Sequence, residues 1–110
     1  MKILLAVDGS EFTKKMLAYL VTHDEVFSAA QQFTLLTVQP PLPLRARKLV
    51  GKEAVASYHR EEAENVLGPV IQFLLRHGIN AKSLTQVGHA GEMIAKTAES
   101  GKFDMVVLGS

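Results

Sequence analysis

The 110-residue chain contains no cysteine. This absence excludes a disulfide scaffold, a thiol nucleophile and a cysteine-based zinc site. Basic and acidic residues are nearly balanced, because 12 basic and 11 acidic residues leave a formal charge of only +1. We therefore expect neither nucleic acid nor a membrane surface as a partner. No apolar run approaches the roughly 20 residues of a membrane helix, and the run after Lys2 is too short for a signal peptide. Together these absences predict a soluble, cytoplasmic protein.

The common motifs of phosphate binding and catalysis are missing as well. The chain has neither Gly-x-Gly-x-x-Gly after its first apolar run nor a P-loop. The spacing of its four histidines, at 23, 59, 77 and 89, does not suit a metal site. Ser10 lacks a nucleophile-elbow context and an obvious histidine partner, so we expect it to cap a helix. The sequence thus predicts no catalytic residue and no metal ligand.

The most informative stretch is the apolar run over 3–7, which ends at Asp8-Gly9-Ser10. An unbroken apolar run is typical of a parallel strand that is buried on both faces. Gly9 allows a tight reversal, and Ser10 is a good N-cap for the helix that follows. Ligands of open α/β sheets bind outside the carboxyl ends of such strands. Asp8 is therefore either a ligand-facing residue or simply the start of a turn.

Hydrophobic periodicity predicts the remaining elements. Helices are expected over 11–22, 24–30, 52–76 and 92–100, and strands over 33–38, 81–87 and 103–108. This alternation in one domain, 1–110, indicates an α/β fold, a three-layer doubly wound parallel sheet. The first and fourth strands are the most apolar, so we expect them to be adjacent at the centre. The third is less apolar and suits an edge.

Three local expectations follow from the same reading. One face of the first helix should carry its apolar residues at helical spacing, namely Phe12, Met16, Tyr19 and Leu20. Gly68-Pro69 should bend the long helix, because proline removes a hydrogen bond of the ladder. The basic cluster Arg45–Lys48 follows three prolines and is expected in a mobile loop. It is either a solvated segment or a phosphate clamp that overhangs a site.

Four stretches, in order, carry a resemblance to one family. The opening Lys-Ile-Leu-Leu-Ala-Val-Asp-Gly-Ser resembles the first strand of the universal stress protein family, and Leu35–Val38 resembles its second. Gly88–Ile94 is similar to the family's turn into its third helix, and Phe103–Ser110 resembles its fourth strand. The resemblance covers the whole chain in the family's order and spacing.

The resemblance implies an adenine-nucleotide alpha-hydrolase-like fold with a five-stranded sheet of order 3-2-1-4-5, and a homodimer. Some members of the family bind ATP. They use an aspartate after the first strand, a backbone group after the second and a Gly-x-x-Gly-x₉-Gly-Ser/Thr loop after the fourth. Carried onto this sequence, the pattern predicts a nucleotide site formed by Ala6, Val7, Asp8, Val38, Leu108, Gly109 and Ser110. ATP, with or without Mg²⁺, is the implied ligand.

The sequence departs from the family's pattern at its end. Gly109-Ser110 stands where the family's glycine-rich loop, last helix and fifth strand would begin, so we expect this C-terminal part to be missing. Two functions stay open, a stress-response module that binds ATP or another adenine nucleotide, and a dimeric interaction or signalling protein without nucleotide. A hydrolase or nucleotidyl-transferring enzyme of a related α/β superfamily is the least favoured reading, because no paired acid, base and nucleophile is present. We expect at most weak ATP hydrolysis.

Overall fold

The computed structural model describes residues 1–23 and 31–109. Strands and helices alternate along the chain, as the periodicity predicts. Their order is β1 (Lys2–Val7), α1 (Glu11–Thr22), β2 (Gln32–Gln39), α2 (Leu44–Arg76), β3 (Lys82–Val87), α3 (Ala90–Ser100) and β4 (Met105–Gly109). The short helix expected over 24–30 lies outside the described residues.

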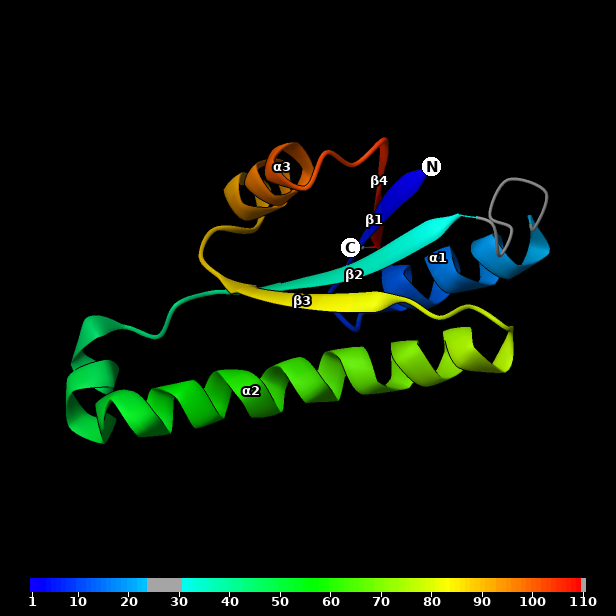
Figure 1. The fold of residues 1–110 in the computed structure, drawn as a ribbon. Helices are drawn as coiled ribbons and strands as arrows, with labels where there is room; N and C mark the ends of the chain where they lie inside the picture. The colour runs from blue at the N-terminus through cyan, green and yellow to red at the C-terminus, as the bar shows by residue number, and fades with distance from the viewer. Residues whose placement is uncertain (24–30, 110) are drawn as a thin grey trace.

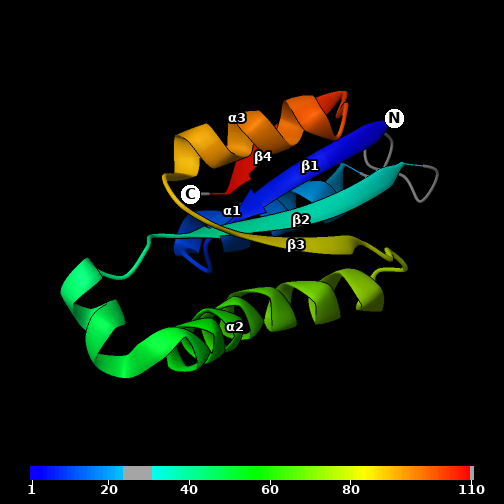
Figure 2. The ribbon, with the colours of Figure 1, turned by 60° about the vertical axis from the view of Figure 1, so that its left-hand side comes forward.

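The four strands form one parallel sheet in the order β3-β2-β1-β4. α1 and α2 lie on one face of this sheet, and α3 lies on the other (Figures 1 and 2). The fold is therefore a three-layer doubly wound α/β domain, as predicted. β1 pairs with β2 on one side and with β4 on the other, so that Leu5 stands opposite both Leu35 and Val107. The carboxyl ends of β1, β2 and β4 consequently lie at the same end of the sheet.

The main core lies between the sheet and the layer of α1 and α2. Alternate residues of β1 and β2 point into it and meet buried residues of both helices, among them Ile3, Leu5, Leu35, Leu20 and Leu74. The intervening strand residues face α3, where Leu4 and Leu36 are fully buried. β1 and most of β2 are thus covered on both faces, which explains why β1 is apolar after Lys2 and β2 is mostly apolar, without strict alternation.

The buried face of α1 differs from the expected one. Thr13 and Leu17 are buried beside Met16 and Leu20, whereas Phe12 and Tyr19 are 61% and 54% exposed. The buried set has the i, i+3, i+4, i+7 spacing of an amphipathic helix. Thr13 can occupy this stripe because its hydroxyl bonds to Asp8, as described below.

β4 is adjacent to β1, as predicted, but it is not central among the described strands. Met105 and Val107 pack against the main core, whereas Val106 and Leu108 are 38% and 60% exposed. β4 is thus covered mainly on its core face, because α3 covers only part of the opposite sheet face. The expectation that β3 is an edge strand is confirmed.

α2 begins at Leu44, and this corrects two expectations. Arg45–Lys48 is helical rather than a loop, since Pro43 sets the backbone for a first turn and the residues that follow are good helix formers. The non-helical break lies at Gly51 (φ 85°, ψ 167°), whereas Pro69 lies inside helix without such a break. Buried Leu67 and Val70 on either side of Pro69 hold that part of α2 on the sheet. No helix within 1–23 and 31–109 combines the length and hydropathy needed to cross a bilayer.

Candidate functional site at the carboxyl ends of β1 and β2

The turn after β1 is built around the carboxylate of Asp8. Its Oδ1 accepts a hydrogen bond from the backbone N–H of Ser10 at 2.9 Å. Gly9 between them has a φ of 79°, a left-handed conformation that glycine adopts without strain. Ser10 occupies the N-cap position of α1, as predicted, but its side chain makes no capping hydrogen bond. Asp8 is therefore the side chain that organises the start of the helix.

Thr13 holds Asp8 from the first turn of α1. Its hydroxyl donates to Asp8 Oδ1 at 3.0 Å and accepts from the Asp8 backbone N–H at 3.2 Å. Partial burial raises the pKa of the Asp8 carboxyl, but the hydrogen bonds from Ser10 and Thr13 outweigh it and leave the pKa below its ordinary value. Asp8 is thus a fixed, ionised acceptor whose side chain remains exposed.

A cleft of about 220 Å³ opens beside Asp8, at the carboxyl ends of β1 and β2. The lining residues come from both strand ends and from α2, and they are Asp8, Thr37, Val38, Gln39, Pro40, Tyr58, Glu62 and Val66. The structure therefore brings together two of the predicted site residues, Asp8 and Val38. Sequence reasoning missed the contribution of α2, above all Tyr58 and Glu62. Their helical spacing of four residues was the only available signal.

A pair of hydrogen bonds fixes α2 against the end of β2. The buried side chain of Gln39 donates through Nε2 to the backbone oxygen of His59, and its Oε1 lies 2.8 Å from His59 Nδ1. Since the amide oxygen can only accept, Nδ1 of His59 carries the proton in this arrangement. The carbonyl of Gln39 also accepts from the N–H of Gly88, which ties the end of β3 to the same point. These bonds position the neighbouring Tyr58 at the cleft.

Four further predicted residues are not part of the cleft lining, namely Ala6, Val7, Leu108 and Gly109. Ala6 and Val7 are buried in β1, at 7% and 4% exposure. Leu108 pairs with Ala6 and Gly109 with Val7, so the end of β4 lies on the other side of β1 from the cleft. Ser110 lies outside the described residues. The role of these residues in binding stays a prediction.

The charges of the cleft are negative. Asp8 and Glu62 line it, and none of the described lining residues is a lysine or an arginine. Arg45–Lys48 belongs to the first turns of α2, beyond the break at Gly51, and does not contribute to this lining. A phosphate placed directly against the two carboxylates would be repelled, whereas a sugar hydroxyl could donate to either of them. The geometry therefore suits a neutral, hydroxyl-bearing group better than an anion.

The sequence pattern of the universal stress protein family matches residues 1–110, the whole chain. The chain belongs to the universal stress protein family. This membership confirms the resemblance seen in the four sequence stretches, and the observed sheet order agrees with it. The comparison with curated proteins found no significant match.

Solved structures of other universal stress proteins share the fold. One from Burkholderia pseudomallei is 18% identical with a TM-score of 0.74, covering 99% of this chain and 80% of its own. One from Arabidopsis thaliana, with AMP bound, is 14% identical with a TM-score of 0.72, covering 100% of this chain and 76% of its own. A third, in complex with cAMP, is 14% identical with a TM-score of 0.57, covering 96% and 73%. At these identities the likeness concerns the fold alone.

Proposed function

We propose that this member of the family binds an adenine nucleotide, with the nucleoside part in the cleft beside Asp8. The observation that carries the proposal is the carboxylate of Asp8, which two hydrogen bonds hold at the carboxyl end of β1 while its side chain stays exposed. Ligands of open parallel sheets bind at this place. The AMP and cAMP complexes of the two proteins named above support the choice of ligand class.

The size of the cleft limits what it holds. At about 220 Å³ it lies below the roughly 300–1,000 Å³ of pockets that enclose a drug-sized ligand. We therefore expect the cleft to hold the nucleoside part of the ligand and not the whole nucleotide. In the proposed pose the ribose donates to Asp8, the Tyr58 ring and Val38 contact the base, and the phosphates extend out of the cleft.

The two carboxylates decide how phosphates approach. Asp8 and Glu62 disfavour direct contact with a triphosphate, so the pose requires either phosphates that point to solvent or a bridging Mg²⁺ with carboxylate and phosphate oxygens as ligands. Titrations of ATP with and without Mg²⁺ distinguish the two. A Mg²⁺ requirement that disappears in Glu62→Gln, but not in Glu61→Gln on the adjacent exposed position, would support the bridged arrangement.

The experiment that tests the proposal is calorimetric titration of the chain with ATP, AMP and cAMP. Asp8→Ala should weaken binding by roughly 1–3 kcal/mol, the range for a lost hydrogen bond to a charged group. Asp104→Ala serves as the matched control, because Asp104 lies at the opposite end of the sheet, where it accepts from the N–H of Lys2. Unchanged affinity in Asp8→Ala, or no binding of any of the three nucleotides, would contradict the proposal.

The expected homodimer and cytoplasmic location belong to the same proposal. A stress-response module of this family would act as a dimer that carries one nucleotide per protomer. Sedimentation of the chain with and without nucleotide measures the first point. If a dimer forms and no nucleotide binds, the interaction protein of the same fold becomes the better reading.

A further inference from the structure

We propose that the outer edge of β3 is a docking site for an extended segment of a partner protein, in which apolar residues alternate with acidic ones. The segment would pair with β3 as a fifth strand. It would place its apolar side chains in a groove on one face of the sheet and its acidic side chains in a groove on the other. This inference does not depend on the nucleotide site, which lies beyond the carboxyl ends of β1 and β2.

The edge of β3 has the properties of a strand that can accept a partner. β3 pairs with β2 along residues 82–87, and no other strand in the described part of the chain pairs with its outer side. Its residues are exposed or half-buried, and Leu84 and Val87 are 40% and 42% exposed. The strand contains no proline and a single charge, at Lys82. Natural edge strands usually carry more protection against pairing than this.

The face of β3 that points to α2 borders an apolar groove. Ser83 and Thr85 line this groove of about 440 Å³, together with residues of α2 that include Ala63, Leu67 and Ile71. Its surface is mainly apolar, because the small strand residues leave the side of the helix uncovered. The groove lies along the edge strand, so side chains of an added strand could reach it. It therefore favours apolar side chains at every second position of a partner.

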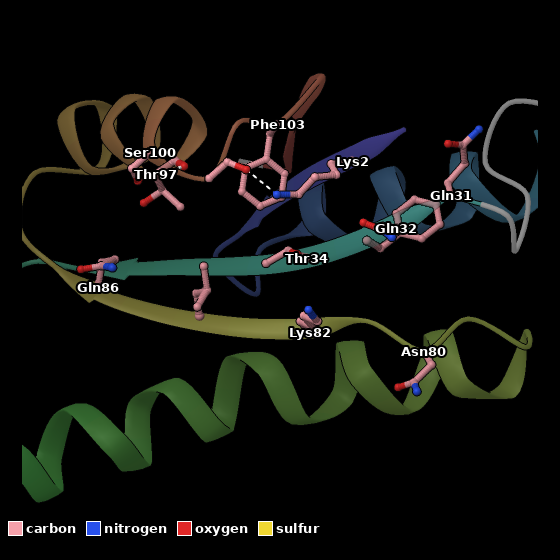
Figure 3. Close-up of a pocket in the computed structure, with 13 residues that line it drawn as sticks. Lys2, Gln31, Gln32, Thr34, Asn80, Lys82, Gln86, Thr97, Ser100 and Phe103 are labelled. Carbon is pink, nitrogen blue, oxygen red and sulfur yellow. Dashed lines mark hydrogen bonds between the residues drawn. The ribbon is translucent and has the colours of Figure 1, made fainter.

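The opposite face of β3 borders a larger and basic groove. Lys82, Leu84 and Gln86 line it from β3, and the groove of about 510 Å³ extends to the end of α3 and to Lys2 (Figure 3). The Lys2 ammonium donates to the carbonyl of Gly101. No hydrogen bond or ion pair joins the side-chain ammonium of Lys82 to any residue that the structure describes. The described lining contains no carboxylate, so an acidic side chain would be the first counter-charge.

The two grooves act together because of strand geometry. Successive side chains of a strand point to opposite faces of a sheet, so one extended segment beside β3 reaches both grooves in alternation. Main-chain hydrogen bonds to the edge would give affinity, and the grooves would give sequence preference. A second copy of β3 lacks the matching pattern, since Lys-Ser-Leu-Thr-Gln-Val contains no acidic residue for Lys82. The charges thus favour a different protein over self-pairing.

The test uses a fluorescein-labelled peptide with the core Val-Glu-Val-Glu-Val-Glu and the intact chain. Fluorescence polarisation should show saturable binding, and the amide resonances of residues 82–87 should shift most in an NMR titration. A peptide with Lys in place of each Glu should bind at least about threefold more weakly, because an exposed ion pair is replaced by like charges. A peptide of the same composition ordered Val-Val-Val-Glu-Glu-Glu should also bind more weakly, because it cannot alternate between the grooves.

Lys82→Glu should weaken binding of the Val-Glu peptide about three- to tenfold. Lys96→Glu, on an exposed position of α3 outside the groove lining, should leave the affinity unchanged. Both residues are exposed, so a common melting temperature checks that the variants are folded. The proposal is overturned by equal affinity for the three peptides, by shifts centred outside residues 82–87, or by no binding up to about 1 mM. A dimer whose formation protects the amides of 82–87 and excludes the peptide would make a second copy the occupant, and would also overturn it.

Discussion

Replacement of Thr13 by valine tests the bond network that holds Asp8. Thr13 is 2% exposed, and its hydroxyl both donates to the carboxylate and accepts from the backbone N–H of Asp8. Valine keeps the shape and removes both interactions. Each hydrogen bond contributes about 0.5–1.5 kcal/mol net, and the bond to the exposed carboxylate belongs at the low end because solvent screens it. We expect the free energy of unfolding at pH 7 to fall by about 1–2 kcal/mol, measured by urea denaturation.

The pH dependence gives a second measure of the same network. The pKa of Asp8 is lowered in the folded chain, so its contribution to stability is present above its ordinary pKa of about 3.9 and is lost as the pH falls through the folded value. In Thr13→Val the pKa of Asp8 should move upward. The stability difference between the two proteins should therefore shrink as the pH falls from about 4 through the lowered pKa of Asp8 in the wild type, because below that value neither protein has an ionised Asp8.

Carboxyl NMR of Asp8 in both proteins follows the titration directly. Thr22→Val, on the exposed end of α1, serves as the control and should change stability by less than about 0.5 kcal/mol. The reasoning is refuted if Thr13→Val is as stable as the wild type and the pKa of Asp8 is the same in both proteins.

Three further predictions concern the scaffold. Gly9→Ala should lower the free energy of unfolding by about 1–2 kcal/mol, because φ is 79° at this position and the added methyl would meet only ordinary contacts at Val66. Gly68→Ala inside α2 should instead raise it by roughly 0.5–1 kcal/mol, and urea denaturation that shifts the stability of both variants in the same direction would contradict this. Leu36→Ala should lower the free energy of unfolding by about 2–5 kcal/mol and Leu84→Ala by less than about 1 kcal/mol, because only Leu36 is fully buried. Equal urea midpoints for the two variants would argue against the described burial. Val107→Asp should unfold the domain, because Val107 packs against the main core. Ser83→Asp on the exposed edge should lower the free energy of unfolding by less than about 1 kcal/mol. Equal melting temperatures for the two variants would mean that the strand order is wrong.

Sequence reasoning succeeded where one physical requirement dominates a stretch. The unbroken apolar run of β1 indicated a strand covered on both faces, and the less apolar stretch over 81–87 indicated an edge strand. Sequence reasoning failed where contacts with other residues decide which side chains are buried. Thr13 is buried because Asp8 satisfies its hydroxyl, and Phe12 and Tyr19 are exposed because the stripe of α1 runs through Thr13 and Leu17 instead.

The candidate site was likewise predictable from the sequence only in part. Asp8 follows β1 and Val38 lies near the end of β2, and parallel pairing alone places both at one end of the sheet. Tyr58 and Glu62 are about 20 residues from Val38 along the chain, inside a helix whose own pattern gives no sign of a ligand. They reach the cleft because Gln39 bonds to His59 and fixes α2 against the strand end.

By itself, the sequence determined the order of the elements, the parallel sheet, the place of Asp8 and the membership of the family, because these depend on local patterns of apolar and turn residues. Only the tertiary structure decided which side chains surround Asp8, how the charges of the cleft combine, and which grooves border β3. These features arise from contacts between residues distant in sequence, and such contacts leave no period or spacing in the chain.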